Sequence, residues 1–410
     1  MYTFAIQLLD LVYLNQIGAF FAFYILTWLV LGVKLNRTSK YKSIDKIKGK
    51  TPSVTVIIPV VDEPDAVWRK VLTAIKIAVK DLDSETFVVC NGDNCVHESA
   101  IAKEMGFTVL KIQEADKRLA IAEGVRHATK DITILLDSDT IATPNSIKEL
   151  IKSFVDPTVG GVVPKQEVFN RESNLMRRLC DWFEDVRFNN TTKGMSYYNA
   201  VPCLIGRLFA IRTDALRRYI PDFCNEYFLG VRAVTGDDRV LTSMLLQDGY
   251  KTLYDDKALV YTDSPETLGK FIKQRTRWSR SSFRETLRAL PWIFKHPYTA
   301  FVLLSDIVLR WLLFYVYVRF VGTLIGVIHA DHWIASAYPL LDTILVWLVA
   351  GFIGFIISGY LKQIPHLRRY PQDFKYVPAF LFITAFVLTP VEWYGNITFN
   401  SRSWLTRKLN

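Results

Sequence analysis

The chain has 410 residues and a formal net charge of +10 at pH 7, and half of its residues are hydrophobic. A mean hydropathy of +0.16 is high for a purely soluble protein and predicts membrane segments beside a folded domain. Residues 34–50 carry seven Lys or Arg against one Asp, and residues 362–375 carry four against one. Because this charge borders apolar segments, it follows the positive-inside rule and argues against a nucleic-acid-binding role.

The N-terminal region, residues 1–36, is predicted to be a membrane segment. Residues 17–33 carry no charge and are long enough to span a bilayer. Residues 3–14 are mostly apolar but shorter, and could form a partial membrane helix. No basic stretch precedes the first apolar run and no A-x-A site follows it, so we expect no cleavable signal peptide. The basic run after residue 33 predicts that the next region is cytosolic.

Residues 51–265 have the pattern of an α/β domain. Continuous apolar runs with many β-branched residues predict four buried strands, at 53–60, 86–91, 107–112 and 132–137, with helix-like segments between them. This alternation predicts a mostly parallel, doubly wound sheet, in which ligands bind at the carboxyl ends of the strands. Five cysteines without metal-ligand spacing predict reduced thiols in a cytosolic compartment.

The C-terminal part is predicted to return to the membrane. Residues 266–298 mix basic, aromatic and apolar side chains, as interfacial helices do. The region 299–410 then contains apolar runs at 299–328, 338–361 and 377–395. A full last span would leave the basic C-terminus outside, against the positive-inside rule. We therefore expect the run 377–395 to be re-entrant, with a break at Pro390.

Two pairs of carboxylates follow predicted elements of the α/β domain. Asp137 and Asp139 end a buried strand, where hard oxygen ligands suit Mg²⁺ or Mn²⁺ and a diphosphate. Taken alone, this D-x-D pair is as well explained by turn or capping carboxylates. Asp237 and Asp238 precede a helix-like stretch, and one of them could accept a proton from a hydroxyl group. Helix capping explains that pair equally well.

Two groups of cations accompany the carboxylates. Lys117 and Arg118 follow the strand at 107–112 and could neutralise phosphate or simply begin a solvated helix. The sequence QRTRW at 274–278 offers two arginines for a diphosphate and an indole for a sugar ring. A basic amphipathic helix on anionic lipid would have the same composition. The flanking Lys273 and Arg280 are expected to face lipid or solvent.

The order of these motifs resembles that of membrane-bound family 2 glycosyltransferases, in the branch that holds hyaluronan synthases and the type 3 capsular polysaccharide synthase. The resemblance is carried by VIIPVVDEP, D-x-D, the G-D-D-R turn, QRTRW and the tail SRSWLTRK, and it extends over nearly the whole chain. It implies a GT-A-type, Rossmann-like domain flanked by transmembrane and interfacial helices. It also implies UDP-sugar donors, a growing polysaccharide acceptor and Mg²⁺ or Mn²⁺.

On the donor side, the resemblance assigns residues one by one. Asp62 and Glu63 lie where the uridine pocket begins, and Asn91 stands where a second Asp usually occupies a D-D-G turn. Lys117 matches the diphosphate-contacting lysine of a G-K-R motif. The donor-side residues also include the D-x-D pair, of which Asp139 is the better metal ligand and Asp137 contacts substrate and metal.

On the acceptor side, Arg207 falls in the acceptor-binding loop and Asp238 matches the general base, with Asp237 beside it in the catalytic pair. The diphosphate and acceptor contacts of QRTRW are assigned to its four matching residues, Gln274, Arg275, Arg277 and Trp278. Trp404 and Arg407 resemble a gating segment that closes over the nucleotide, although Leu405 replaces its glycine.

The resemblance therefore predicts a processive, inverting synthase in the plasma (inner) membrane, with several spans, a cytosolic catalytic domain and lipid contacts, that requires no protein partner. Asp306, Arg310 and Arg319 could line a polymer path, or Asp306 and Arg310 could form an i, i+4 ion pair. Two alternatives to the synthase remain open. One is a single-transfer enzyme acting on a lipid acceptor, and the other is a membrane scaffold or transporter without catalysis.

Overall fold

The computed structural model describes residues 16–45, 49–93, 95–233, 235–324 and 359–401. The chain divides into two compact units. Residues 37–299 and 394–410 form one, which we call the sheet unit, and residues 1–36 and 300–393 form the other, which we call the helical unit. The predicted gating residues Trp404 and Arg407, the partial helix at 3–14 and residues 338–358 of the run at 338–361 lie outside the described residues.

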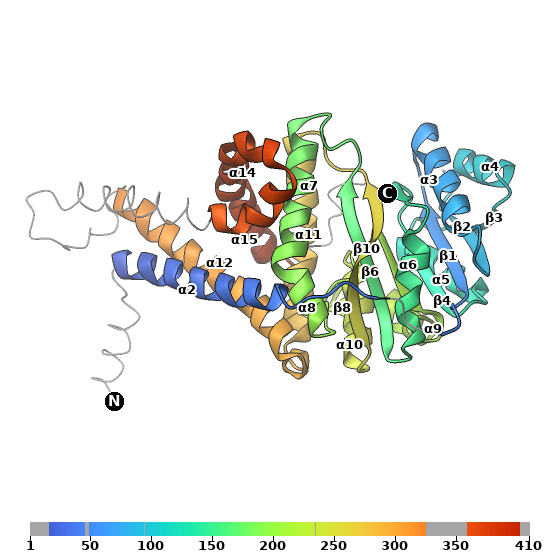
Figure 1. Ribbon diagram of the computed structural model, residues 1–410, viewed down its shortest axis with the longest axis horizontal. Coiled ribbons are helices and arrows are strands. Elements are labelled where there is room, and N and C mark those ends of the chain that lie inside the picture. Colours follow the sequence, from blue (N-terminus) through green and yellow to red (C-terminus); the bar gives the residue numbers. More distant parts are fainter. Residues whose placement is uncertain (1–15, 46–48, 94, 234, 325–358, 402–410) are drawn as a thin grey trace, which may run out of the picture. The chain divides into compact units, whose positions relative to one another are not determined.

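The sheet unit is built on an eight-stranded sheet with the order β3-β2-β1-β4-β7-β6-β10-β5 (Figure 1). Its strands are β1 (Val54–Val60), β2 (Ser84–Asn91), β3 (Thr108–Ile112), β4 (Ile132–Leu136), β5 (Thr140–Ala142), β6 (Val159–Val168), β7 (Leu208–Arg212) and β10 (Lys251–Thr262). The first four pair in parallel, at the positions that the apolar runs predict. Strand β7 runs antiparallel to both β4 and β6, and β5 runs antiparallel to β10.

Helices cover both faces of the sheet, which explains why its central strands are apolar throughout. Every residue of β1 and β4 is buried. Alternate residues of β1, beginning at Val54, join a core with α3 (Asp65–Ala78), α4 (Val96–Glu104) and α6 (Ser146–Ile151). Ile57 points to the opposite face, where a Cβ on Gly124 of α5 (Lys117–His127) would lie 2.5 Å from it. The alternation of side chains along β1 therefore contributes to two cores, one on each face of the sheet. In such sheets ligands bind at the carboxyl ends of the strands.

The remaining helices of the sheet unit surround the second half of the sheet. They are α7 (Leu175–Arg187), α8 (Lys193–Tyr197), α9 (Thr213–Cys224), α10 (Asp237–Gln247) and α11 (Leu268–Ala289). A short hairpin, β8 (Tyr227–Phe228) and β9 (Val231–Arg232), precedes α10. Thr267 caps α11 by accepting a hydrogen bond from the Lys270 backbone N–H.

Helix α11 packs against the last described residues of the chain. Gly395 approaches it so closely that an added Cβ would lie 2.5 Å from the Cβ of Ser279. Arg280 donates a hydrogen bond from Nε to the Thr398 hydroxyl at 2.9 Å and is 5 % exposed. The expectation that Arg280 faces lipid or solvent is therefore wrong, because the end of the chain covers it.

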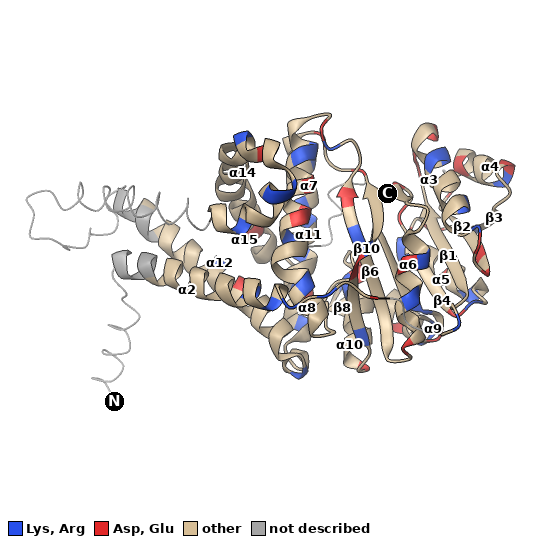
Figure 2. Ribbon diagram, in the orientation of Figure 1, with Lys and Arg blue, Asp and Glu red and all other residues tan. Residues whose placement is uncertain are grey.

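The helical unit contains α12 (Pro297–Leu324), which begins three residues before the unit does, and most of α2 (Gln16–Thr38) and α15 (Thr389–Ile397), together with α14 (Val377–Ile383). Residues 17–33, which the sequence predicts to span the membrane, lie within α2. Among the described residues, two helical segments are long and apolar enough to cross a bilayer, Pro297–Val318 and Pro371–Ile397. Figure 2 shows the coloured parts of α2 and α12 as predominantly uncharged.

Two charged residues of α12, Asp306 and Arg310, form ion pairs with other helices. Asp306 of α12 forms an ion pair with Lys34 of α2. Arg310 of α12 donates from Nε to Glu392 of α15 at 2.9 Å, and the Trp393 indole donates to the Arg310 carbonyl at 3.0 Å. The i, i+4 pair between Asp306 and Arg310 is therefore not what the structure records, since each of these residues has an ion-pair partner on another helix.

The helix does not break at Pro390, contrary to the expectation from sequence. Helix α14, a π-helical turn (Thr384–Leu388) and α15 follow one another without interruption. Proline lacks the N–H that would continue an α-helical ladder, and wider π-type turns accommodate such a loss. The Thr389 hydroxyl donates to the Thr384 carbonyl at 3.0 Å, which satisfies one of the carbonyls in this turn.

Candidate active site

Two neighbouring cavities, of about 190 and about 610 Å³, open at the carboxyl ends of β1 and β4 in the sheet unit. Volumes of this order suit a ligand the size of a nucleotide or a sugar. The side chains that line both cavities include two aspartates after β4, one aspartate of α10, one lysine of α5 and two polar residues of α11, namely Asp137, Asp139, Asp237, Lys117, Gln274 and Arg277.

The larger cavity is bordered by residues that follow β1 and β2. Glu63 comes three residues after β1, and its carboxylate accepts a hydrogen bond from the Ser138 hydroxyl at 2.6 Å. Asn91 ends β2 and is 3 % exposed, and within the described residues its side-chain oxygen has no hydrogen-bond partner. A buried amide without a partner is costly, so its oxygen is a candidate ligand contact. Asp62, by contrast, is exposed and is absent from the lining of both cavities.

The D-x-D carboxylates occupy the turn after β4. Lys117 begins α5, and its Nζ lies 2.6 Å from Asp137 Oδ1. Burial, together with the nearby carboxylates of Asp137 and Glu63, raises the pKa of Asp139 to about 7, while Arg207 acts in the opposite direction. The turn is therefore a buried site of concentrated negative charge.

We tested whether this turn fits the divalent metal that the sequence predicts. Oxygen donors of this kind are the ligands that Mg²⁺ and Mn²⁺ prefer. The donor chemistry and the accumulated negative charge therefore fit such an ion, with Asp139 and Asp137 as its protein ligands. Over the residues that the structure describes, no cluster of three or more His, Cys, Asp or Glu is arranged to hold a metal. The remaining positions would thus be left for phosphate oxygens or water.

Two adjacent aspartates begin α10 and point to different neighbours. Gly236 precedes them with φ of 90°, a left-handed conformation that glycine adopts without strain. The Asp238 carboxylate lines the smaller cavity and accepts hydrogen bonds from the Gly206 backbone N–H at 2.9 Å and from the Cys203 thiol at 3.4 Å. The Asp237 carboxylate lies 3.0 Å from Nε of the buried Arg118.

The QRTRW stretch lies on α11, and its helical spacing divides it between two faces. Gln274, Arg277, Trp278 and Ser281 share one face and line the smaller cavity. Arg275 lies outside both linings, where its guanidinium sits over Phe183, Phe271 and Trp278 with its Nη2 3.8 Å from Glu184. Burial lowers the pKa of Arg275.

Residues 52–281 match the sequence model of a family described as "Glycosyltransferase like family 2". The chain belongs to this family. The match includes every motif described above except the C-terminal tail. It confirms the family predicted from the motifs and, at the level of the family, the prediction that the chain is an enzyme.

Curated relatives of this glycosyltransferase agree with that assignment. Hyaluronan synthase of Streptococcus pyogenes is 29% identical over 292 residues, which cover 71% of this chain and 66% of the relative. The chain thus spans just under two thirds of the length of that synthase. An N-acetylglucosaminyltransferase of Neorhizobium galegae is 25% identical over 380 residues, which cover 90% of this chain and 83% of the relative.

A solved structure shows the same fold as this family 2 glycosyltransferase. A mannosyltransferase from Pyrobaculum calidifontis, in complex with GDP-Man and Mn²⁺, superposes with a TM-score of 0.64 over 93% of this chain and 97% of that chain. At 17% identity this likeness concerns the fold alone. It confirms the predicted α/β, Rossmann-like GT-A architecture.

The structure brings most of the predicted site residues of this glycosyltransferase together. Three residues considered in the sequence analysis, Asp62, Arg118 and Arg275, lie outside the lining of both cavities. Arg207 lines the smaller cavity and its guanidinium sits 5.5 Å from the centre of the Trp278 ring. Of the two cations suggested as phosphate ligands, Lys117 lines the cavities and Arg118 is turned away into a buried ion-pair network.

That network was missed by the sequence analysis of this glycosyltransferase. It joins Arg118 to Glu226, Arg284, Glu285 and Arg288, of which Arg284 and Glu285 lie in RWSRSSFRE (277–285), a stretch that also resembles the family, and were assigned no role. The one signal available from sequence is the density of charge in RSSFRETLR, residues 280–288, on a helix whose other face is already assigned to the cavity. A charged residue on that second face has to find buried partners of opposite sign.

Proposed function

We propose that this chain is a processive, inverting glycosyltransferase that polymerises UDP-sugars, glucuronic acid with glucose or N-acetylglucosamine, into an extracellular or capsular polysaccharide. One observation carries the proposal. A single cavity is lined by the D-x-D carboxylates, by Asp238 and by Trp278. A donor phosphate site, a candidate base and an aromatic surface for a sugar are thereby within reach of one bound substrate pair.

The donor would bind at the carboxyl ends of β1, β2 and β4. Glu63 and Asn91 border the larger cavity, where a nucleoside would fit, and the unsatisfied Asn91 oxygen would accept a hydrogen bond from it. Lys117 and Arg277 would contact the diphosphate, with Gln274 between them and the sugar. Asp139 and Asp137 would hold Mg²⁺ or Mn²⁺, which when bound neutralises charge on the departing diphosphate.

Transfer would proceed by displacement in line with the bond to the leaving group. Asp238 accepts the proton of the acceptor hydroxyl, whose oxygen forms a bond to the anomeric carbon of the donor. The bond from that carbon to the diphosphate oxygen breaks, and UDP leaves with the electron pair. The configuration inverts because the hydroxyl attacks from the side opposite the leaving group. Lys117 and Arg277 stabilise the negative charge that develops on the leaving group.

The acceptor end of the cavity would hold the terminal sugar of the growing chain. Trp278 offers an aromatic face there, and two guanidinium groups, those of Arg207 and Arg275, lie 5.5 and 4.8 Å from the centre of its ring. Because these cations are held by Glu184, the indole has a fixed orientation. Arg275 would thus act on the acceptor through Trp278 rather than by contacting the diphosphate.

A processive synthase would also pass its product through the membrane in which it sits. The apolar segments Pro297–Val318 and Pro371–Ile397 support a membrane location, as does the basic charge beside apolar runs. We propose a multi-pass protein of the plasma (inner) membrane with the sheet unit in the cytosol. Arg319 on the polymer path and Trp404 with Arg407 as a gating segment remain predictions from sequence.

The test is to offer single and paired UDP-sugars to reconstituted protein with Mg²⁺ or Mn²⁺ and to size the product. We expect long polymer only when UDP-glucuronic acid is combined with UDP-glucose or with UDP-N-acetylglucosamine. Elongation with one sugar alone would contradict the heteropolymer, and absence of UDP release from all three donors would contradict the glycosyltransferase activity itself.

A second candidate is a single transfer of one sugar to a lipid acceptor. It is favoured by the match to proteins named N-acetylglucosaminyltransferase, a name that specifies a transferred sugar and no polymer, over 90% of this chain. The same product analysis separates the two candidates. A monoglycosylated lipid as the sole product would establish the single transfer and end the proposal of processive synthesis.

A further inference from the structure

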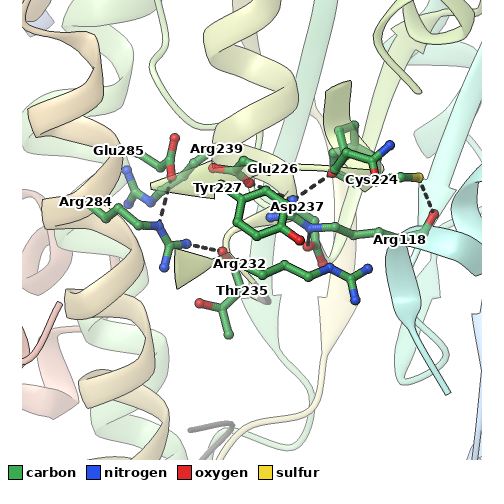
Figure 3. Close-up of polar contacts among 12 residues, drawn as sticks. Arg118, Cys224, Glu226, Tyr227, Arg232, Thr235, Asp237, Arg239, Arg284 and Glu285 are labelled. Atoms are coloured by element: carbon green, nitrogen blue, oxygen red, sulfur yellow. Dashed lines mark hydrogen bonds and ion pairs between the residues drawn. The ribbon is translucent and has the colours of Figure 1, made fainter. Parts of the chain in front are cut away.

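A buried network of arginines and carboxylates borders the cavities at the start of α10, where its member Asp237 lines both of them. We call it the arginine–carboxylate network. Its members alternate in sign and come from α5, α10, α11 and the turn after α9, and they are Arg118, Asp237, Glu226, Arg284, Glu285 and Arg288. Figure 3 shows Arg118 and Arg284 approaching the start of α10 from opposite sides.

Arg118 is the member that comes from the phosphate side of the site. It is 3 % exposed, its Nε lies 3.0 Å from Asp237 Oδ1, and its Nη1 lies 2.6 Å from Glu226 Oε2. Nη1 also donates to the Phe223 carbonyl at 2.7 Å, and the guanidinium sits over the Phe223 ring. The residue before it in α5 is Lys117, which is paired with Asp137 in the cavity.

The other side of the network comes from α11, the helix that carries QRTRW. Arg284 is 4 % exposed and donates from Nη2 to the Thr235 carbonyl, two residues before Asp237. Arg288 pairs with Glu226 and donates to the Tyr227 carbonyl at 2.8 Å. Glu285 lies 3.2 Å from Arg284 Nε and 3.7 Å from Arg288 Nη1. The turn at Gly236 is therefore held on both sides, by an arginine from α5 and by an arginine from α11.

A second contact reinforces the attachment of α5. Asp116 caps α5 by accepting a hydrogen bond from the Arg118 backbone N–H at 2.8 Å. Its other carboxylate oxygen accepts from Arg232 of β9 at 3.0 Å. The first turn of α5 is thus joined to the hairpin and to α10 by two separate ion pairs.

We propose that Arg118 is a positioning residue for the transfer reaction. By holding the Asp237 carboxylate it fixes the first turn of α10 in the rotation that turns Asp238 into the cavity, and it sets that turn in register with Lys117. This inference rests on the proposed function. It assigns the two aspartates of G-D-D-R different duties, since Asp238 meets the acceptor and Asp237 is the anchor for Arg118.

The test is a double-mutant cycle with Arg118→Gln, Asp237→Asn and the pair of both. Displacement of a reacting group by about 1 Å can cost about 100-fold in rate, so we expect each single variant to lower kcat by about that factor. We expect the double variant to be no slower than the slower single variant, because both changes remove one contact. In Arg118→Gln, the KM for the UDP-sugar and the affinity for UDP with Mn²⁺ should stay within about threefold, because Lys117 keeps its own contacts and Arg118 lines neither cavity.

Two further variants separate positioning from folding. Arg118→Lys keeps the charge but cannot bind Asp237 and Glu226 together, and we expect it to recover part of the lost kcat. Arg126→Gln removes an exposed arginine of the same helix α5, whose partner is Glu123, and we expect it to behave as the wild type. Asp237→Asn keeps the size of the side chain and removes only the charge of the ion pair, so it provides a folded variant if Arg118→Gln does not fold.

The outcomes are distinguishable. Wild-type kcat in folded Arg118→Gln or Asp237→Asn, with only a lowered thermal midpoint, would show that the network is purely structural and would overturn the inference while leaving the proposed function intact. Independent, multiplicative losses in the double variant would also overturn it. Wild-type protein that neither binds UDP nor releases it from a UDP-sugar would overturn the proposed function, and this inference with it.

Discussion

The cavity and the arginine–carboxylate network meet at the peptide bond between Asp237 and Asp238. The carboxylates of these two residues have different kinds of partner. On the network side, Glu226 and Glu285 each lie near one or more arginines, and Asp237, which also lines both cavities, lies 3.0 Å from Arg118 Nε. On the cavity side, the contacts of Asp238 are with a backbone N–H and a thiol, which are neutral donors. In the network each carboxylate is paired with at least one arginine, whereas the cavity leaves negative charge for a substrate or a metal to complete.

This difference gives a criterion for separating structural from reactive carboxylates in the same motif. Burial of a charge is tolerated when a partner of opposite sign compensates it, and breaking such a pair leaves a buried charge uncompensated. A carboxylate bound by neutral donors, as Asp238 is, keeps the capacity to accept a proton. The comparison therefore predicts different consequences for substitutions on the two sides.

The largest effect is expected for Asp238→Asn. An amide cannot accept the acceptor proton, so we expect transfer to fall by about 10³-fold or more, at the upper part of the range for general bases. UDP binding, measured by calorimetry with Mn²⁺, should be unchanged. The control is Asp222→Asn, which alters an exposed carboxylate on α9. Loss of UDP binding in the Asp238 variant would mean that another residue is the base.

A smaller effect of a different kind is expected for Lys117→Gln. Hydrogen bonds to charged groups contribute about 1.5–3 kcal/mol, so loss of the contact to diphosphate should weaken UDP binding by about 10- to 100-fold. The KM for the donor should rise with it, in contrast to the kcat effect expected at the neighbouring Arg118. The control is Lys130→Gln, which changes a surface ion pair with Asp83. Unchanged UDP affinity would place the diphosphate elsewhere.

On the acceptor side, Trp278→Phe should shorten the product more than it slows UDP release. The smaller ring loses part of the stacking surface, and aromatic contacts of this kind contribute about 0.5–1.5 kcal/mol, or up to about tenfold in acceptor affinity. The initial rate of UDP release at saturating donor and the size of the polymer measure the two effects. Polymer of wild-type length would argue that the indole does not hold the growing chain.

Much of the fold and the donor side of the site could be predicted from the sequence, because strand ends meet at one edge of a parallel sheet. Asp137, Asn91 and Lys117 each follow or end a predicted strand, and the structure gathers them for that reason. The position of Arg275 outside the cavities could also have been predicted, because the helical period sets it about 100° from Gln274. What sequence could not separate was Asp237 from Asp238.

That separation depends on side chains far away along the chain. Arg118 precedes Asp237 by 119 positions, and Arg284 reaches Thr235 across 49. Neither contact follows from a local pattern, because charge and spacing are the same whether a residue faces the cavity or the network. Only the packing of α5 and α11 against the start of α10 decides it.

A change in the pH dependence of stability, and not in transfer, is expected for Glu285→Gln, and it tests whether the network is electrostatically matched. Burial, together with the nearby Glu226 carboxylate, raises the pKa of Glu285 from 4.5 to about 7, while Arg288 and Arg284 act in the opposite direction. The folded protein therefore holds this proton more tightly than the unfolded chain. Stability from this group is present below about pH 4.5 and is lost as the pH rises toward 7, by up to about 3 kcal/mol.

Glutamine does not titrate, so the variant should lose less stability than the wild type between pH 5 and pH 8, measured as the thermal midpoint at each pH. Glu172→Gln, at an exposed position of the sheet unit, should retain the wild-type dependence. If Glu285→Gln instead lowers the midpoint equally at every pH, then the carboxylate is ionised and fully compensated by Arg284 and Arg288. The network would in that case be matched throughout, and the contrast with the cavity would be stronger than the pKa of Glu285 suggests.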